Sequence, residues 1–139
     1  MARSVGDIMT RNPRTVDAGD SVAEAARQMR DGDFGSVLVL RDGRVDGIVT
    51  DRDIAVRAVA EGRDPESTPV SEISSTGVAT VEPSQSIDEA VQTMREQDIR
   101  RLPVVENGQP VGILSLGDLA VEQDPESVLA DISASSPDQ

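Results

Sequence analysis

The sequence predicts an α/β chain of the α+β type, built from two tandem β-α-β-β-α repeats. The first observation behind this prediction is an ungapped match between residues 5–56 and 70–121 at a constant offset of 65, which indicates an internal duplication. The second is a stretch of helical periodicity in each half, and the third is a pair of apolar runs joined by a two-residue turn. Repeats of this size are small for independent stability, so we expect the two to pair about a pseudo-twofold axis.

Each repeat is expected to open with a short amphipathic segment, Val5 to Met9 or Val70 to Ser74, and to continue with a short strand and a helix. The strands are predicted around Thr15-Val16 and Thr80-Val81. A capping box then opens each helix, Ser21-x-x-Glu24 in the first repeat and Ser86-x-x-Glu89 in the second. Matching apolar residues recur at helical spacing after both boxes: Val22, Ala25, Ala26 and Met29, and then Ile87, Ala90, Val91 and Met94. We expect the second helix to end near Gln97.

A β-hairpin follows each of these helices. In the first repeat, residues 37–40 and 45–49 are apolar runs on either side of Asp42-Gly43. Asp-Gly and Asn-Gly are the residue pairs that tight hairpin turns prefer. The second repeat has the same pattern around Asn107-Gly108, where Pro103 and Pro110 indicate strand ends or edges.

A final helix is expected after each hairpin, from Asp51 to about Glu61 and from Leu116 onward. The predicted organisation is a first repeat at 5–63, a linker at 64–69, a second repeat at 70–122, and a C-terminal cap segment with a polar tail at 123–139.

One short pattern occurs a third time. Val128-Leu129-Ala130-Asp131-Ile132 echoes Val5-Gly6-Asp7-Ile8 and Val70-Ser71-Glu72-Ile73. We expect either a generic amphipathic turn here or a cap that packs where a third repeat would begin.

The composition narrows the possible functions. The chain has no Cys, no His and no Lys, which removes thiolate metal sites, the commonest general base, the Walker lysine and Schiff-base chemistry. We therefore expect no enzymatic activity and no metal site. The start of the chain lacks an apolar signal-peptide core, and no stretch approaches the roughly 20 apolar residues of a membrane helix. We expect a cytoplasmic protein. A net charge of −13 disfavours binding to nucleic acid or to a membrane.

A seven-residue motif, Gly-aliphatic-x-[Ser/Thr]-x-x-Asp, occurs once in each repeat. The copies run from Gly47 to Asp53 and from Gly112 to Asp118. Each motif takes a strand into the first turn of a helix, where free backbone N–H groups and the helix dipole suit phosphate. A carboxylate one turn on suits the hydroxyls of a ribose.

The alternative interpretation of the motif is another capping box, in which both side chains satisfy the helix's own backbone. Both helix-opening boxes above use Glu, whereas both copies of the motif use Asp. Taken alone, either copy is more often a cap than a ligand site. We expect the shorter acid to reach back less well, which tilts the prediction only slightly toward a ligand site.

The duplication, the element order and the two motifs Gly47-Ile48-Val49-Thr50-Asp51-Arg52-Asp53 and Gly112-Ile113-Leu114-Ser115-Leu116-Gly117-Asp118 together resemble a CBS-domain pair, the Bateman module. The stretch from Asp98 to Val105 also resembles the segment that precedes the hairpin in that family. The resemblance covers residues 5–132. It implies a stand-alone regulatory module that binds adenosine nucleotides or S-adenosylmethionine in two clefts between the paired repeats.

The resemblance also implies which residues line the clefts. One cleft would use Ile48, Thr50 and Asp53 with Val78, Ala79, Ile99 and Arg100, and the other would use Ile113, Ser115 and Asp118 with Pro13, Arg14, Phe34 and Gly35. Arg100 and Arg101 could bind phosphate oxygens or form ion pairs with acidic neighbours. Phe34, the single aromatic residue, could fill the core or stack on a base. Because the first repeat has Gly35-Ser36 in place of the two arginines, we expect the clefts to differ.

The predicted function is a non-enzymatic sensor for an adenosine-containing ligand that signals to a partner protein. AMP, ADP or ATP is the expected ligand, with S-adenosylmethionine or NAD as second choices, and no cofactor is required. The alternative is a ligand-free module for protein interaction. The resemblance also implies a homodimer, for which Ile54, Ala55, Ala58 and Val59 offer an apolar helix face; the competing interpretation is that these residues face the core of their own chain.

Overall fold

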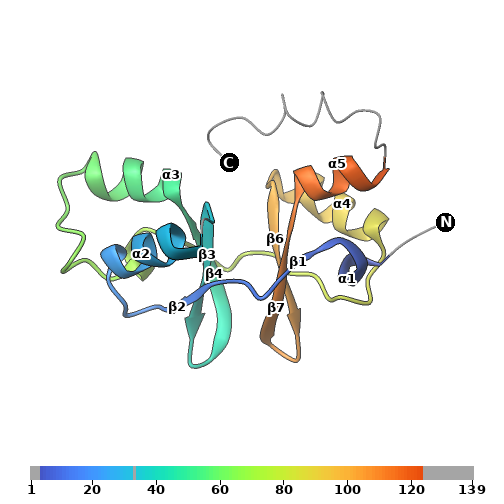
Figure 1. The fold of residues 1–139 in the computed structure, drawn as a ribbon, viewed down its shortest axis with the longest axis horizontal. Coiled ribbons are helices and arrows are strands. Elements are labelled where there is room, and N and C mark those ends of the chain that lie inside the picture. The colour runs from blue at the N-terminus through green and yellow to red at the C-terminus, as the bar shows by residue number, and fades with distance from the viewer. Residues whose placement is uncertain (1–3, 33, 124–139) are drawn as a thin grey trace. The chain divides into compact units, whose positions relative to one another are not determined.

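The computed structural model describes residues 4–32 and 34–123. The chain forms two compact units, each built around one repeat (Figure 1). The first unit comprises residues 13–78, and the second comprises residues 4–12 together with 79–123. Each unit is a small sheet with helices, so the predicted α+β class and the two repeats are confirmed. The predicted boundaries divide the chain by its repeated sequence, whereas the two units are divided by their contacts. Residues 5–12 therefore lie in the second unit and residues 70–78 in the first.

The first unit has a four-stranded sheet in the order β2-β3-β4-β5. Its strands are β2 (Thr15–Asp17), β3 (Ser36–Arg41), β4 (Arg44–Thr50) and β5 (Ser75–Thr76). β2 runs parallel to β3, and the other neighbours are antiparallel. The helix α2 (Val22–Gly32) connects β2 to β3.

The second unit has a three-stranded sheet in the order β1-β7-β6. Its strands are β1 (Thr10–Arg11), β6 (Arg101–Glu106) and β7 (Gln109–Ser115), and both pairings are antiparallel. Its helices are α1 (Val5–Ile8), α4 (Ile87–Gln97) and α5 (Leu116–Gln123). The end of α4 at Gln97 is where the sequence predicts it.

Both predicted hairpin turns are confirmed. Asp42 and Gly43 have φ of 54° and 80°, and Asn107 and Gly108 have φ of 55° and 80°. Two successive residues of positive φ are what the tightest hairpin turn requires, and Asp or Asn followed by Gly tolerates that conformation best.

The strand predicted around Thr80-Val81 is wrong in extent, since only an isolated parallel bridge joins Val81 to Val104. In the first unit the matching strand is longer, and the N–H of Leu38 donates to the carbonyl of Arg14 over 2.9 Å. The residue matching Leu38 is Pro103, which has no N–H to donate. The ladder of the second repeat is therefore shortened by this proline, which lies, as predicted, on an edge strand.

The helix predicted after Thr50 is present but changes type. It begins as α3 (Asp51–Asp53) and continues as the π-helix η1 (Ile54–Val59). The N–H of Ala60 donates to the carbonyl of Ala55 over 2.9 Å, which is the wider i→i+5 spacing of a π-helix.

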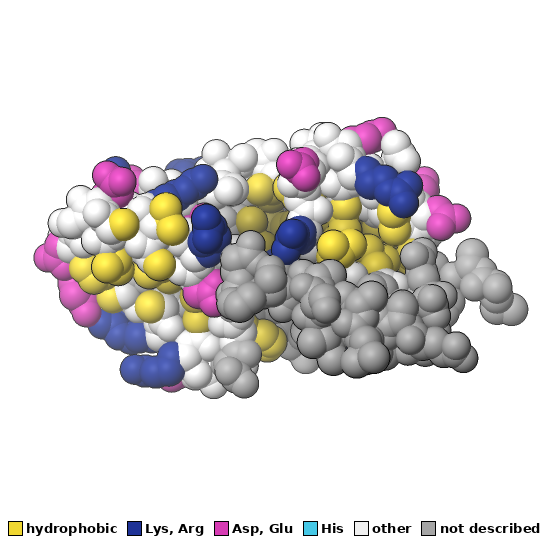
Figure 2. Space-filling model, turned by 90° about the horizontal axis from the view of Figure 1, so that it is seen from above, with side chains coloured by type: hydrophobic (Ala, Val, Ile, Leu, Met, Phe, Trp, Pro, Cys, Tyr) yellow, Lys and Arg dark blue, Asp and Glu magenta, His cyan; other side chains and the backbone are white. Residues whose placement is uncertain are grey.

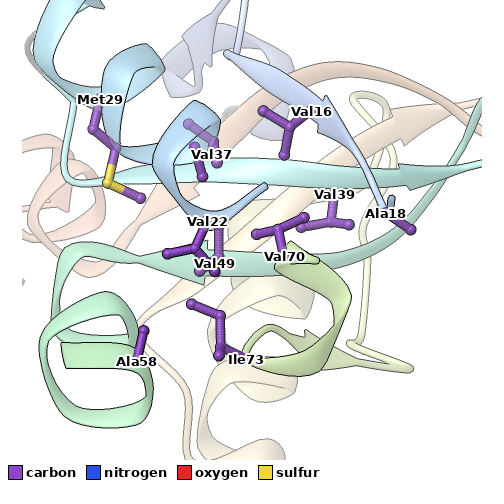
Figure 3. Packing of buried hydrophobic residues seen from close by; sticks show 11 residues of the cluster. Val16, Ala18, Val22, Met29, Val37, Val39, Val49, Ala58, Val70 and Ile73 are labelled. Carbon is purple, nitrogen blue, oxygen red and sulfur yellow. The ribbon is translucent and has the colours of Figure 1, made fainter. Parts of the chain in front are cut away.

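The core of each unit is aliphatic, as the composition predicts. The buried residues of the first unit are Val16, Ala18, Val22, Ala25, Met29, Val37, Val39, Val49, Ala58, Val70 and Ile73 (Figure 3). Those of the second unit are Val5, Met9, Val81, Ile87, Ala90, Met94, Leu102, Val104, Leu114 and Leu119. Burying an aliphatic side chain of this size contributes about 1.5–3 kcal/mol.

Each core includes residues from a short segment that precedes the other repeat in the sequence. Val70 and Ile73, the first of which begins the 3-10 helix η2 (Val70–Glu72), belong to the core of the first unit. Val5 and Met9 belong to the core of the second unit. The segment that opens each repeat is therefore packed in the unit of the other repeat.

Candidate functional site

The motif of the first repeat forms a capping box at the start of α3. The N–H of Thr50 donates to the carboxylate Oδ2 of Asp53 over 2.9 Å, and the N–H of Asp53 donates to Oγ1 of Thr50 over 3.1 Å. The motif of the second repeat has the same geometry, because the N–H of Ser115 donates to Asp118 Oδ2 and the N–H of Asp118 donates to Ser115 Oγ, both over 3.1 Å. The expectation that Asp would reach back less well is wrong.

A comparison with the Glu boxes supports this correction. Ser86 and Glu89 make the same reciprocal pair, at 3.1 Å in both directions. At the Ser21 box, the N–H of Glu24 donates to the serine hydroxyl. The Glu24 carboxylate accepts from the side chains of Gln28 and Arg27. The length of the acidic side chain therefore does not decide whether both hydrogen bonds of a capping box form.

The backbone amides of the first turn of α3 are also occupied. The Asp51 N–H donates to the carbonyl of Gly35 over 3.0 Å, and the Arg52 N–H donates to the Asp51 carboxylate over 2.8 Å. With the Asp53 N–H bonded to Thr50, the expectation of free amides for phosphate is wrong for the first repeat. In the second repeat, the Leu116 N–H donates to the carbonyl of Arg100 over 2.9 Å.

The side chains of the motif keep capacity for a ligand. Asp53 and Asp118 are half-buried, and each carboxylate has about four acceptor positions, of which the box uses one. The other oxygen of Asp53 lies 3.8 Å from Nε of Arg57, a long contact to an exposed guanidinium. Hydroxyl donors such as those of a ribose could therefore still reach both carboxylates.

In the first unit, the structure brings Pro13, Arg14, Phe34, Gly35, Ile48, Thr50 and Asp53 into one compact body. Gly35 is bonded to the first residue of α3, as described above. Phe34 is 36% exposed and lies outside the core cluster of its unit, so the core-filling interpretation is wrong. A Cβ built on Gly32 would lie 2.7 Å from the Phe34 ring and 2.8 Å from Nε of Arg14, which places these two side chains around the end of α2.

In the second unit, the structure brings together Ala79, Ile99, Arg100, Arg101, Ile113, Ser115 and Asp118. Arg101 is paired with Ser115 across β6 and β7, and Arg100 is bonded through its carbonyl to the start of α5. Val78 lies in the first unit, next to the boundary. The assignment of residues to clefts between the repeats stays a prediction.

A cavity of about 400 Å³ lies beside the motif of the second repeat. It is lined by Val91, Met94, Arg95, Asp98, Ile99, Arg100, Leu116 and Leu119. The sequence pointed to Ile99 and Arg100 and missed the others. Leu116 is the signal that could have drawn attention to this surface, because it is an apolar residue inside the motif, at the first position of the predicted helix.

Other kinds of site find no support in the described part of the chain. Among residues 4–32 and 34–123, no group of three or more acidic, His or Cys side chains could hold a metal ion. No helix in these residues is long and apolar enough to cross a membrane.

Comparison with known protein families identifies the same two repeats. The family model for the CBS domain matches residues 5–59 and again residues 70–123. The CBS domain-containing protein YhcV of Bacillus subtilis (strain 168) is 45% identical over 120 residues, which cover 86% of this chain and 85% of that protein.

Solved structures agree with the sequence comparison. A protein with CBS domains from Burkholderia ambifaria MC40-6 has 36% identity and a TM-score of 0.77, covering 88% of this chain and 95% of that one. The CBS domain pair of protein MJ0100, solved in complex with 5'-methylthioadenosine and S-adenosyl-L-methionine, has 25% identity and a TM-score of 0.79, covering 91% of this chain and 99% of that one. This chain belongs to the CBS-domain family, with two CBS domains in tandem.

Proposed function

We propose that this CBS pair is a regulatory module that binds an adenosine-containing ligand and signals its presence to a partner protein. The observation that carries the proposal is the hydroxyl–carboxylate pair, which recurs with the same geometry in both units. In the second unit, Leu116, which stands between Ser115 and Asp118 in the sequence, lines a cavity. Further support comes from MJ0100, a CBS pair whose complex contains two adenosine compounds.

The cavity of the second unit suits the parts of such a ligand. Met94, Ile99 and Leu116 offer an aliphatic surface for adenine, and cavities of 300–1,000 Å³ are typical of small-molecule sites. Asp118, which follows the lining residue Leu116 by two positions, would accept hydrogen bonds from ribose hydroxyls beside the cavity. Arg100, which already has an interaction in the structure, would turn part of its guanidinium toward a phosphate.

AMP, ADP and ATP are the proposed ligands, because an arginine beside the cavity favours a phosphate. S-adenosylmethionine and NAD remain second choices. The helix N-termini have a smaller role than the motif alone suggests, since the first amides of α3 are bonded within the protein.

We expect that replacing Asp118 by Asn weakens ligand binding about tenfold, the equivalent of 1.4 kcal/mol, because the amide cannot accept from two hydroxyls as a carboxylate does. In thermal unfolding, a ligand at 100 times its Kd stabilises the wild type by about 2.7 kcal/mol, and the same concentration would stabilise Asp118→Asn by about 1.4 kcal/mol. AMP, ADP, ATP, NAD and S-adenosylmethionine are each tested.

Glu89→Gln is the matched control, because Glu89 makes the same box with Ser86 at the start of α4. It should lose stability without ligand but keep the full ligand-induced shift. Asp53→Asn reports on the first repeat in the same way. If none of the five compounds raises the melting temperature of the wild type, the ligand-free interaction module becomes the better account.

CBS-domain proteins are generally regulatory and non-catalytic, and we propose the same for this chain. It has no His, Cys or Lys, so catalysis would depend on carboxylates and arginines. Incubation with ATP and Mg²⁺ should return the nucleotide unchanged by chromatography. Formation of AMP or ADP at a rate that Asp53→Asn or Asp118→Asn abolishes would contradict the proposal.

We also propose that the protein is a homodimer, joined through the exposed side of η1. Val56 and Val59 are 46% and 65% exposed, and Figure 2 shows hydrophobic side chains at the surface on the left of the view, where this helix lies. Ala58 is fully buried and Ile54 packs against the core, so the competing interpretation is right for these two residues.

Light scattering should give twice the mass of the 14.7 kDa chain, and Val59→Asp should reduce it to that of one chain because an exposed charge replaces the apolar contact. Glu61→Gln is the control, because it changes an exposed residue near Val59 without adding a charge. A wild-type monomer at physiological salt would contradict the dimer.

A further inference from the structure

Two segments of this chain dock on the two repeats in the same way. The N–H of Val70 donates to the carbonyl of Asp20 over 2.7 Å, and the N–H of Val5 donates to the matching carbonyl of Gln85 over 2.9 Å. One residue further on, Ser71 donates to Ala18 over 3.1 Å and Gly6 donates to Pro83 over 2.9 Å. Both hydrogen bonds are thus reproduced at an offset of 65 residues.

The agreement continues along both segments. Thr76 pairs with Gly47 in the first unit, and Arg11 pairs with Gly112 in the second. The aliphatic residue that opens each segment, Val70 or Val5, is fully buried. We call the surface that receives such a segment the docking groove of its repeat. The segment it receives has the pattern aliphatic-small-acid-Ile.

A third copy of this pattern is present as Leu129-Ala130-Asp131-Ile132, outside the described residues. Its context also repeats, since Asp124-Pro125-Glu126-Ser127 precedes it as Asp64-Pro65-Glu66-Ser67 precedes the segment docked on the first repeat. By position, the third copy follows the second repeat as Val70-Ser71-Glu72-Ile73 follows the first. The groove of the second repeat, however, already holds Val5–Ile8.

We propose that residues 129–132 are an alternative occupant of the docking groove of the second repeat, in competition with the N-terminal segment of the same chain. The groove would then be an exchange site between two segments that are far apart in the sequence. This proposal does not depend on ligand binding.

The connection is long enough for docking within one chain. α1 packs against α5 and β7, so α5 adjoins the segment held in the groove. Six residues lead from Gln123, the end of α5, to Leu129, and they span up to about 20 Å when extended. In the first unit, Ala58 occupies the helix position that matches Gln123, and it lies in the same core cluster as Val70 and Ile73 (Figure 3). The last helix of the first repeat therefore lies next to the segment docked on that repeat.

The N-terminal segment is the better fit, so the third copy is the minor occupant. A Cβ on Gly6 would lie 3.2 Å from Cβ of Pro83, which means that Ala130 would crowd this proline where glycine does not. In the first unit the residue matching Pro83 is the smaller Ala18, which leaves room for Ser71.

A lost ion pair weakens the third copy as well. Glu66 holds Arg27 of α2 at 2.7 Å, and this contact raises the pKa of Arg27. On the second repeat the matching residues are Glu126 and Gln92, which cannot form an ion pair. Weakening the resident segment should therefore be needed to see the exchange clearly.

Disulfide trapping in the full chain tests the proposal, and the chain has no native cysteine to interfere. Gly6→Cys with Pro83→Cys reports the resident segment, because the Cβ separation of 3.2 Å is only slightly shorter than the roughly 3.5–4.5 Å of a disulfide. Ala130→Cys with Pro83→Cys reports the third copy. We expect the second pair to cross-link within one chain, and more efficiently when Val5→Asp weakens the N-terminal segment.

Two controls keep the result interpretable even if Val5→Asp loosens the second unit. Ala130→Cys with Ala18→Cys places the cysteine at the matching position of the first repeat, and it should cross-link less. Ile132→Asp should suppress the Ala130–Pro83 cross-link, since docking needs this apolar residue. Cross-linking no better than the Ala18 pair, unchanged by Ile132→Asp, or formed only between chains would overturn the proposal.

Discussion

Replacing Gly47 by Ala should lower the free energy of unfolding by about 3 kcal/mol, at the upper end for inserting a methyl group into packed structure. A Cβ at this position would overlap the carbonyl oxygen of Ser75 and lie 3.1 Å from its carbonyl carbon. Both atoms belong to backbone, which no side-chain rotation can move aside. Relief requires that β5 separate from β4, and Val70 and Ile73 just before β5 would be pulled from the core. Urea denaturation measures the loss.

Gly19→Ala is the matched control for this change. A Cβ at Gly19 meets nothing within 4 Å, so alanine there should leave stability unchanged or raise it by about 0.4–1 kcal/mol through the unfolded chain. Gly112→Ala should cost less than Gly47→Ala, because its closest contact, at 2.6 Å, is the Met9 side chain, and its backbone contact, the carbonyl oxygen of Thr10 at 2.8 Å, is less severe than the overlap with Ser75. Equal stability of the Gly47 and Gly19 variants would mean that β5 is not held against β4.

These glycines give the repeated motif a structural meaning at its first position. Gly47 and Gly112 are the residues on which a docked segment pairs, with Thr76 and Arg11 respectively. The motif therefore combines two requirements. Its glycine leaves space for the strand of the docked segment, and its acid caps the following helix. The sequence indicated the cap but gave no sign of the docked strand.

The parts of the fold that could be predicted are those set by nearby residues. Asp42-Gly43 and Asn107-Gly108 determine their hairpins because few other pairs accept two positive φ values. The box at Ser86 and Glu89 and the apolar spacing after it determine α4. The offset of 65 residues then transfers each element from one repeat to the other.

The docking of the opening segments could not be predicted in this way. A constant offset states that residues 5–11 resemble residues 70–76, and it does not state which repeat either segment packs on. Both segments leave their own repeat, as the hydrogen bonds of Val5 and Val70 show. The choice depends on contacts distant in sequence, to which periodicity and capping rules are blind.

The candidate site divides along the same line. Thr50, Asp53, Ser115 and Asp118 could be placed at strand-to-helix junctions from the sequence, because the box is local. That α3 has its first amide bonded to Gly35 depends on a residue sixteen positions earlier, just before β3, so the occupied helix N-terminus could not be foreseen. The cavity beside Leu116 is likewise lined by residues of both α4 and α5, which lie far apart in the sequence.

Replacing Ile73 by Ala should cost about 3–4 kcal/mol, within the 2–5 kcal/mol range for a buried Ile. Ile73 is 1% exposed in the core of the first unit. The matching residue, Ile8, is only partly buried beside the core of the second unit, so Ile8→Ala should cost about half as much because less surface is lost from contact. Urea denaturation of both variants gives the comparison.

Hydrogen exchange decides which unit each residue stabilises. The predicted repeat boundaries place Ile73 in the second repeat, whereas its packing against Val49 and Ala58 places it in the first unit. Ile73→Ala should therefore speed amide exchange in β3 and β4 more than in β6 and β7, and Ile8→Ala should do the reverse. If Ile73→Ala instead exposed β6 and β7, the segment would be packed on the repeat it precedes, and both the docking groove and its proposed exchange would lose their foundation.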